Sequence, residues 1–373
     1  MALTSSSLLW ALALGVLVVS GLVLWLWPRA ARGGIAGWSA RIGLLLVAQF
    51  ALLSVLLVGA NRTFGFYSSW AELFGRASSQ QSLNEATGDG KRPPALTVKG
   101  VESIGLKGTK EVAGQVERVD IRGPLTGLTM SGYVYLPPQY YQRGHEQEKF
   151  PVVVAVTGQP GISKNLITQL KVPQSVSAAV MAKKIRPTIY VLVRPSLVPG
   201  RDTNCTDVPG GPQALTFFNQ DLPLAVAARY RTTDAPGSWG AVGNSTGGYC
   251  ALKFAMTNPA RYGAAAGLSA DYFARQDRDT GDLYDRSAKL RRESDLIWRL
   301  KNRPAPPVSL LLSSSKQGEA NYKPTLDFAA AAKAPTRVAQ LIREEGGHNF
   351  QTWREEYPEV ILWLDRELQR PAS

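Results

Sequence analysis

The sequence predicts an α/β fold class, a mostly parallel sheet flanked by helices, preceded by a transmembrane helical hairpin. Three observations support this prediction. Two long apolar runs precede position 61, strands alternate with helices from about Leu96 onward, and several of those strands are continuously apolar. Alternating strands and helices are typical of a parallel sheet whose helical crossovers cover both faces. At 373 residues, the chain is long for one compact domain but short for two large ones.

The two apolar runs span Leu8–Trp27 and Ile42–Ala60, and neither contains a charged residue. At about 1.5 Å per residue, a helix of either length crosses a hydrocarbon core of about 30 Å. A cleaved signal peptide is the alternative for the first run, but the N-terminus lacks Lys and Arg and the run is too long. We expect residues 1–62 to form two transmembrane helices with a short cytoplasmic loop. Tryptophans near the expected span ends fit an aromatic belt: Trp10, Trp25, Trp27 and Trp38.

The distribution of arginines predicts the orientation. The connector between the two runs carries Arg29, Arg32 and Arg41, whereas the N-terminal tail carries no charged side chain and Arg62 follows the second run. Positive charge near membrane spans favours the cytoplasmic side. The predicted localisation is therefore a cell membrane crossed twice, with everything after Ala60 extracytoplasmic.

A polar stretch separates the second run from the folded domain. An aromatic-rich segment comes first, and residues from Arg76 to about Ala95 then contain almost no large apolar side chain. This composition is typical of a flexible linker. We interpret residues 63–95 as a juxtamembrane segment and tether, and residues 96–373 as the folded domain.

The expected strands of that domain begin with Gln115–Ile121 and Leu128–Leu136, which a Gly/Pro turn joins. Pro151–Val156 and Thr188–Val193 are continuously apolar, as strands buried on both faces are. The later expected strands are Trp239–Val242, Ala264–Leu268, Val308–Leu312 and Val338–Ile342, and the expected helices include Asp221–Arg231, which Asp221 opens, and Gln351–Leu368.

The segment Gly243-Asn244-Ser245-Thr246-Gly247 matches the G-x-S-x-G pattern. A short apolar strand precedes it and a helix of small residues follows, which is the strand–turn–helix arrangement of a nucleophile elbow. Such a turn projects a serine hydroxyl clear of the sheet, and the glycines let strand and helix approach closely. The segment therefore predicts an α/β-hydrolase fold with Ser245 as nucleophile. The alternative is a glycine-rich turn with an incidental serine.

A serine hydroxyl needs an adjacent base, and the chain has two histidines. His145 lies in a charged loop and is expected to be solvated. His348 follows a late strand, and Gly346 and Gly347 before it allow a tight loop. Because α/β-hydrolases run in the order serine, acid, histidine, we expect His348 to be the base.

The acid of the triad should follow the strand Val308–Leu312. Glu319, after Gly318 in a polar loop, is the first choice; Asp327 is the second and Asp271, after the preceding strand, the third. The acid would fix the tautomer of the imidazole and stabilise the imidazolium. Each of the three is otherwise a surface charge.

The oxyanion hole of this fold uses two backbone N–H groups. One belongs to the residue after the nucleophile, Thr246. The other comes from the loop after the strand Pro151–Val156, where Gln159 is the candidate.

The chain has two cysteines, Cys205 and Cys250, too few for a disulfide scaffold or a cysteine-based zinc site. Both map near the carboxyl edge of the expected sheet. We expect a disulfide between them, with two free buried cysteines as the alternative; an oxidising compartment would permit the bond.

The net charge is +13, from 42 Lys and Arg against 29 Asp and Glu. The basic residues are scattered, and no nucleic-acid-binding motif accompanies them. We expect a basic surface beside a membrane and no nucleic-acid partner. No nucleotide-binding loop or metal-ligand cluster stands out, so no cofactor and no metal are expected.

With these residues identified, the part of the chain from about residue 115 to residue 368 resembles the esterase D family of α/β-hydrolases. Within that family it is most similar to the branch of secreted mycolyltransferases and related actinobacterial esterases. The resemblance lies in YVYLPPQY, PVVVAVTGQPG, TFFNQDLPLAVAARYR, GSWGAVGNSTGGYCA, NPARYGAAAGLSADY and GGHNF. It implies a glutamate as acid, which favours Glu319, and oxyanion donors at Thr246 and Gln159. The departures are Thr157-Gly158-Gln159 in place of the usual His-Gly or Asp-Gly, and two spans in place of a signal peptide.

The function expected from these features is hydrolysis of carboxylic (acyl) esters outside the membrane by a Ser-His-Glu triad. The first alternative is acyl transfer to cell-envelope glycolipids, as the mycolyltransferase resemblance implies. The second is a catalytically silent hydrolase-fold protein that binds the envelope. The substrate is expected to be an acyl ester or lipid, and the residues 8–27 and 42–60 to contact membrane lipids.

Overall fold

A computed structural model of the chain describes residues 5–31, 34–64, 70, 95–198 and 201–368. The chain divides into two compact units, Met1–Gln80 and Gln81–Ser373. Most of the predicted tether lies outside the described residues.

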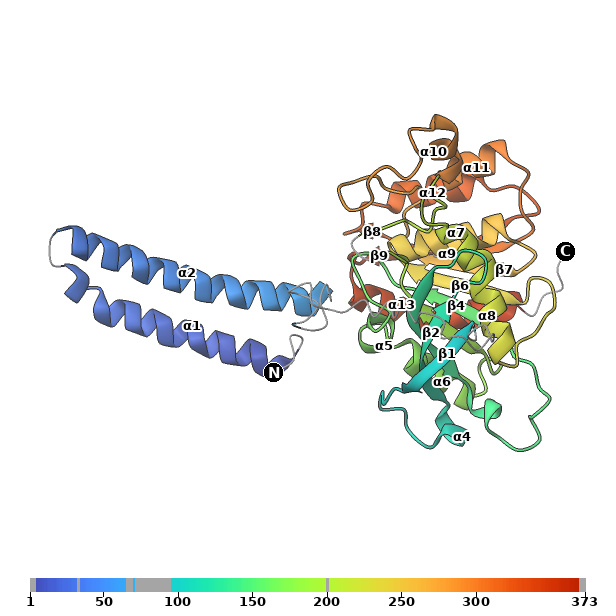
Figure 1. Ribbon diagram of the computed structural model, residues 1–373, viewed down its shortest axis with the longest axis horizontal. Coiled ribbons are helices and arrows are strands. Elements are labelled where there is room, and N and C mark those ends of the chain that lie inside the picture. Colours follow the sequence, from blue (N-terminus) through green and yellow to red (C-terminus); the bar gives the residue numbers. More distant parts are fainter. Residues whose placement is uncertain (1–4, 32–33, 65–69, 71–94, 199–200, 369–373) are drawn as a thin grey trace, which may run out of the picture. The chain divides into compact units, whose positions relative to one another are not determined.

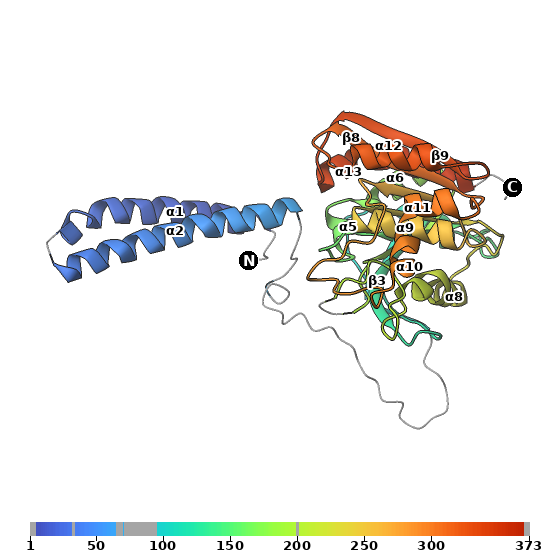
Figure 2. The same cartoon turned by 90° about the horizontal axis from the view of Figure 1, so that it is seen from above.

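The N-terminal unit is a pair of helices, α1 (Ser6–Leu26) and α2 (Ile35–Phe64), with a short 3-10 turn (Arg29–Ala31) between them. They lie side by side (Figures 1 and 2). Both are long and apolar enough to cross a membrane, and no residue of α1 is buried. The two helices fit a transmembrane hairpin.

The second helix starts at Ile35, earlier than the predicted Ile42, so the connector is shorter than expected. No proline interrupts the segment from Ile35, so the helix can begin before the apolar run does, and the Ser39 hydroxyl is satisfied by the carbonyl of Ile35 within the helix. On the other side of the turn, the Arg29 guanidinium donates to the carbonyl of Trp25 and lies over its ring.

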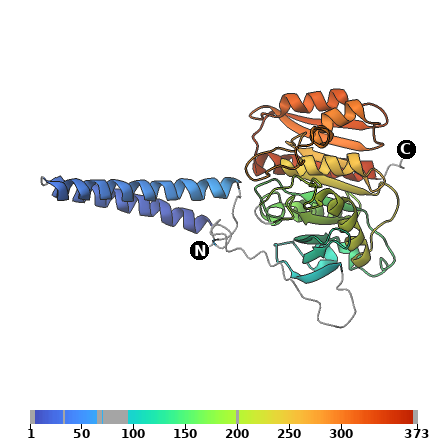
Figure 3. The ribbon, with the colours of Figure 1, turned by 45° about the horizontal axis from the view of Figure 1, so that its top comes forward.

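In the described part of the second unit, strands β1 to β9 form one nine-stranded sheet in the order β1-β2-β3-β5-β4-β6-β7-β8-β9. The pairs β1–β2, β2–β3 and β3–β5 are antiparallel. In the rest of the sheet, β5-β4-β6-β7-β8-β9, each strand is parallel to its neighbours. Figure 3 follows this order from the cyan strands to the orange ones. The strands are β1 (Leu96–Val101), β2 (Gln115–Arg122), β3 (Thr129–Leu136), β4 (Val152–Val156), β5 (Ile189–Val193), β6 (Trp239–Asn244), β7 (Tyr262–Leu268), β8 (Ser309–Gln317) and β9 (Arg337–Glu345).

Helices cover both faces of the sheet, as the strand–helix alternation predicts. The alternating side chains of β4 show this directly: Val152, Val154 and Val156 pack into one apolar core, and Val153 and Ala155 into the other. The first core is covered by α7 (Ala214–Thr216), α8 (Leu222–Arg229), α9 (Thr246–Thr257), α11 (Leu296–Asn302) and α12 (Tyr322–Ala331), and the second by α5 (Asn165–Thr168), α6 (Val172–Met181) and α13 (Phe350–Leu368). Two further short helices are α4 (Lys110–Ala113) and α10 (Ala288–Ser294).

The prediction that Asp221 opens a helix is wrong. A π-helical segment (Phe217–Asp221) precedes α8, and the Asp221 side chain caps no helix. Its carboxylate is fully buried and accepts the backbone N–H of Leu125 and the N–H and hydroxyl of Thr126. The residue therefore anchors the β2–β3 turn, since a buried carboxylate is stable only when its oxygens are hydrogen-bonded.

Candidate active site

Ser245 stands between the end of β6 and the start of α9. Its backbone has φ 54° and ψ −126°, a strained conformation for a residue with a side chain. The N–H of Ser245 donates to the carbonyl of Leu268 at 2.9 Å, which extends the β6–β7 ladder past the last residue of β6. The turn is therefore held by the sheet, and the serine side chain is only partly buried.

Two glycines make this turn sterically possible. A Cβ at Gly247 would lie 2.2 Å from the carbonyl oxygen of Val156, and a Cβ at Gly243 would lie 2.2 Å from that of Gly247. Neither distance is compatible with a side chain. The strand, the helix and the end of β4 approach closely only because both positions are glycine.

His348 lies in the loop between β9 and α13. Its Nε2 is 2.8 Å from the Oγ of Ser245, and its ring packs edge-on against that of Trp353, with centroids 5.1 Å apart. The side chain is 46 % exposed. The other histidine, His145, pairs with Glu148 in the loop before β4.

Glu319 follows the end of β8, and its Oε2 is 3.2 Å from the Nδ1 of His348. Its side chain is only 2 % exposed. The turn at Gly318 has φ 87°, and a Cβ there would lie 2.0 Å from the carbonyl oxygen of Gly346. That glycine thus lets the acid loop and the histidine loop touch.

The two alternative acids each form an ion pair with a residue four positions away. Asp327 sits on α12, where Lys323 approaches it to 2.7 Å, and Asp271 pairs with Arg275 at 2.7 Å. Of the three carboxylates, Glu319 is the one for which the structure records a contact to the imidazole.

The two residues expected to supply oxyanion donors are Thr246, directly after the serine, and Gln159 in the loop after β4. Thr246 is the first residue of α9. Gln159 follows Gly158, and a Cβ at Gly158 would lie 3.1 Å from the Cβ of Ser245. The loop after β4 is thus packed against the nucleophile turn.

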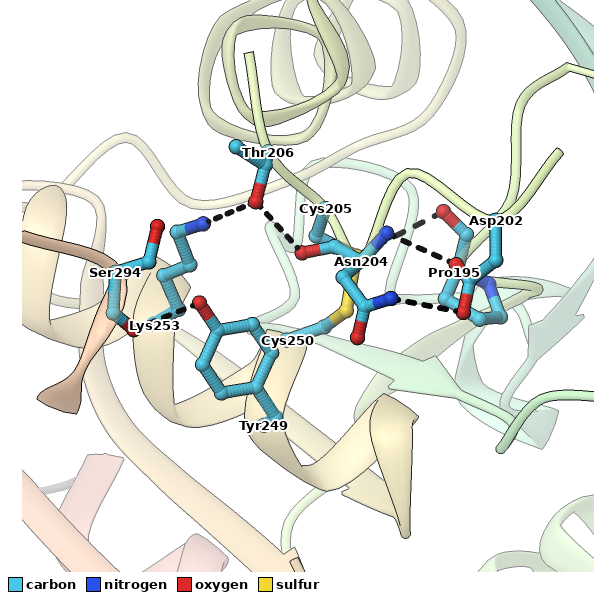
Figure 4. The surroundings of a disulfide bond; sticks show 9 residues. All are labelled: Pro195, Asp202, Asn204, Cys205, Thr206, Tyr249, Cys250, Lys253 and Ser294. Carbon is cyan, nitrogen blue, oxygen red and sulfur yellow. Dashed lines mark hydrogen bonds between the residues drawn. A yellow bond between two sulfur atoms is a disulfide. The ribbon is translucent and has the colours of Figure 1, made fainter. Parts of the chain in front are cut away.

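Cys205 and Cys250 form a disulfide, which joins the loop after β5 to α9 (Figure 4). Both residues are fully buried. One turn later on α9, Lys253 is also buried and donates to the hydroxyl of Thr206 at 2.8 Å. Burial lowers the pKa of Lys253 to about 7, with the carboxylate of Asp207 acting in the opposite direction.

Several polar residues that the sequence does not single out lie close to Glu319. The Oγ of Ser269, at the end of β7, lies 2.5 Å from Oε1 of Glu319, and the indole nitrogen of Trp353 lies 2.8 Å from that Oγ. Glu356 on α13 accepts the hydroxyl of Ser313 at 2.7 Å, and burial raises its pKa to about 7. For Ser269, the sequence signal that could have indicated a role at the site is its position as a polar residue directly after the buried strand β7.

The fold and the site geometry define an α/β-hydrolase-like protein. Residues 124–364 match the model of the family described as "Putative esterase", and the chain belongs to this esterase family.

Solved structures share the fold. A ferulic acid esterase is 17 % identical with a TM-score of 0.57, covering 69 % of this chain and 98 % of its own. The S-formylglutathione hydrolase from Agrobacterium tumefaciens is 15 % identical with a TM-score of 0.60, covering 72 % and 99 %. The fluorophosphonate-binding serine hydrolase F of Staphylococcus aureus is 14 % identical with a TM-score of 0.54, covering 67 % and 98 %.

Among curated proteins, an uncharacterised protein of Corynebacterium glutamicum is 21 % identical over 271 residues. The match covers 65 % of this chain and spans 61 % of the length of that relative.

Proposed function

We propose that this chain is a membrane-anchored serine esterase that hydrolyses carboxylic esters outside the membrane through Ser245, His348 and Glu319. The observation that carries the proposal is the continuous contact from Glu319 through His348 to Ser245, at 3.2 and 2.8 Å. These side chains come from three separate loops at the carboxyl ends of β6, β8 and β9, the edge where parallel α/β sheets hold their active sites.

In the proposed mechanism, the Ser245 hydroxyl attacks the acyl carbonyl while Nε2 of His348 takes its proton. Glu319 accepts the Nδ1–H and stabilises the imidazolium that forms. The proton then passes to the leaving alcohol, and an acyl-enzyme remains. Water, activated by the same histidine, attacks the acyl carbon and releases the acid and the free serine.

The proposed oxyanion donors are the backbone N–H groups of Thr246 and Gln159. Thr246 opens α9, so its N–H belongs to the first turn, whose N–H groups have no carbonyl partner within the helix. The positive end of the helix dipole favours negative charge at the same point. The packing of Gly158 against Ser245 supports the placement of Gln159 beside the reacting carbonyl.

The membrane anchor proposed is the α1–α2 hairpin, with the tether 63–95 linking it to the catalytic domain 96–373. The arginines of the connector support a cytoplasmic turn. The Cys205–Cys250 disulfide supports an oxidising compartment for the catalytic domain, because such bonds are rare in the cytosol.

Activity is tested with the full chain in detergent, using p-nitrophenyl butyrate and a fluorophosphonate probe. Turnover and labelling are expected to vanish in Ser245→Ala and to fall severely in His348→Ala. His145→Ala is the matched control and should behave like the wild type. Turnover that persists in Ser245→Ala would disprove the proposed mechanism. Adding an alcohol acceptor to the assay then separates hydrolysis from acyl transfer, since only transfer yields a new ester.

The orientation is tested with alkaline phosphatase, which is active only outside the cytoplasm, fused after Ser373. An active fusion in intact cells is expected. An inactive fusion, with the protein still present in the membrane, would place the catalytic domain in the cytoplasm.

A further inference from the structure

Ser269 occupies the position on β7 that Ser245 occupies on β6. Each is the first residue after the end of its strand. Each also has a positive φ, 44° for Ser269 and 54° for Ser245. Each also donates its N–H to the next strand along: Ser245 to Leu268 at 2.9 Å, and Ser269 to Ser313 at 3.1 Å. Strain at a non-glycine residue persists only where the surroundings enforce it, and such residues cluster at functional sites.

The side chain of Ser269 is enclosed and fully engaged. It is 2 % exposed, with the Glu319 carboxylate on one side and the Trp353 indole on the other, at 2.5 and 2.8 Å. Trp353 is itself buried, in the first turns of α13. The chain of contacts therefore runs from α13 through β7 to the acid, the base and the nucleophile.

The chemistry of these groups fixes which one donates and which one accepts in each hydrogen bond of this series. The indole N–H of Trp353 can only donate, so the Ser269 oxygen accepts there. The Ser269 hydroxyl proton is then directed to Glu319, whose carboxylate can only accept. With Oε1 occupied in this way, Oε2 accepts the Nδ1–H of His348, which leaves the Nε2 lone pair for the proton of Ser245.

We infer that Ser269 and Trp353 are positioning residues that fix the carboxylate of Glu319 and set the direction of the hydrogen bonds that end at Ser245. The inference rests on the proposed function. A charged group held by a second hydrogen bond keeps its rotamer, and a donor-only group at the far end makes the reverse orientation unfavourable. Trp353 contributes in another way too, because its ring packs against that of His348.

The substitution Trp353→Phe keeps an aromatic ring but removes the N–H, together with the second ring of the indole, so its effect must be compared with an equal loss of volume elsewhere on the helix. Trp363→Phe is the matched control: Trp363 is a buried tryptophan on the same helix, in the same apolar core. The full chain is assayed in detergent with p-nitrophenyl butyrate, and rates are expressed per site titrated by the fluorophosphonate probe. This normalisation removes the effect of unfolded protein.

We expect Trp353→Phe and Ser269→Ala each to lower kcat about tenfold, with little change in KM, because the bond they support strengthens as the imidazolium forms. In the double variant, Trp353→Phe should add almost nothing to Ser269→Ala, since the two act through one chain of contacts. A structural role alone would lower the fraction of titrated sites and leave kcat per site unchanged.

The inference is overturned if Trp353→Phe matches Trp363→Phe in kcat per site, or if the two single effects multiply in the double variant. Should Ser269→Ala fail to fold, the comparison of Trp353→Phe with Trp363→Phe decides alone. Failure of the proposed function is a separate result, because it shows as turnover that survives Ser245→Ala.

Discussion

The ammonium nitrogen of Lys253 lies 2.8 Å from the hydroxyl of Thr206, the residue that follows Cys205 of the disulfide (Figure 4). The loop after β5 is therefore tied to α9 twice, by the bond to Cys250 and by Lys253 one turn later. The same helix begins directly after Ser245. The geometry of the nucleophile turn and the stability of this loop are thus linked, and the following predictions test that link and the buried charges around it.

Replacing both cysteines by alanine is expected to destabilise the second unit, Gln81–Ser373, by about 4 kcal/mol, because the bond closes a loop with a sequence separation of 45. The free energy of unfolding, from urea titration of the full chain in detergent, checks this. A urea titration of the wild type with its disulfide reduced in the unfolded state should give the same loss in the free energy of unfolding. An unchanged urea midpoint in the double variant would contradict it.

Lys253 makes stability depend on pH. Burial lowers its pKa to about 7 in the folded protein, so from pH 7 to about 10.5 the unfolded chain binds the extra proton. Its contribution to stability therefore rises with pH in that window, by at most about 1.4 kcal/mol per unit. Lys253→Met should remove this rise. Equal slopes in wild type and variant, measured from pH 7 to 10, would refute the prediction.

Glu356 acts in the opposite direction. Burial raises its pKa from 4.5 to about 7, so between those values the folded protein keeps a proton that the unfolded chain releases. Its contribution to stability falls as pH rises from 4.5 to 7 and stays low above. Glu356→Gln should flatten that fall. Glu359→Gln, an exposed residue on the same helix, is the control and should leave the pH profile of the wild type intact.

Gly247→Ala tests the close packing of the nucleophile turn. The new methyl group would lie 2.2 Å from the carbonyl oxygen of Val156 and 2.5 Å from that of Thr157, both backbone atoms that cannot move freely. Overpacking of this kind costs roughly 1–3 kcal/mol or more. We expect a lower urea midpoint and a loss of fluorophosphonate labelling of Ser245. Labelling at the wild-type rate would show that the turn tolerates a side chain.

Much of the fold was predictable because its signals are local. The strands that we expected from apolar runs, such as Pro151–Val156 and Thr188–Val193, are β4 and β5 of the sheet, and the two uncharged runs fall almost entirely within α1 and α2. The boundaries were less certain. The second helix begins at Ile35 and β8 continues to Gln317, because hydrogen bonding carries an element past the end of its apolar pattern.

By itself, the sequence determined the class of the fold and the choice of Ser245 and His348 as candidates, because a strand–turn–helix with glycines and a scarcity of histidines are properties of the chain order. The sequence ranked Glu319 ahead of Asp327 and Asp271, but only the tertiary structure shows which of the three touches the histidine, since all three are carboxylates in polar segments. The same holds for Ser269 and Trp353, which lie 84 positions apart. Contacts between distant segments depend on how strands pair and helices pack, and no local pattern records them.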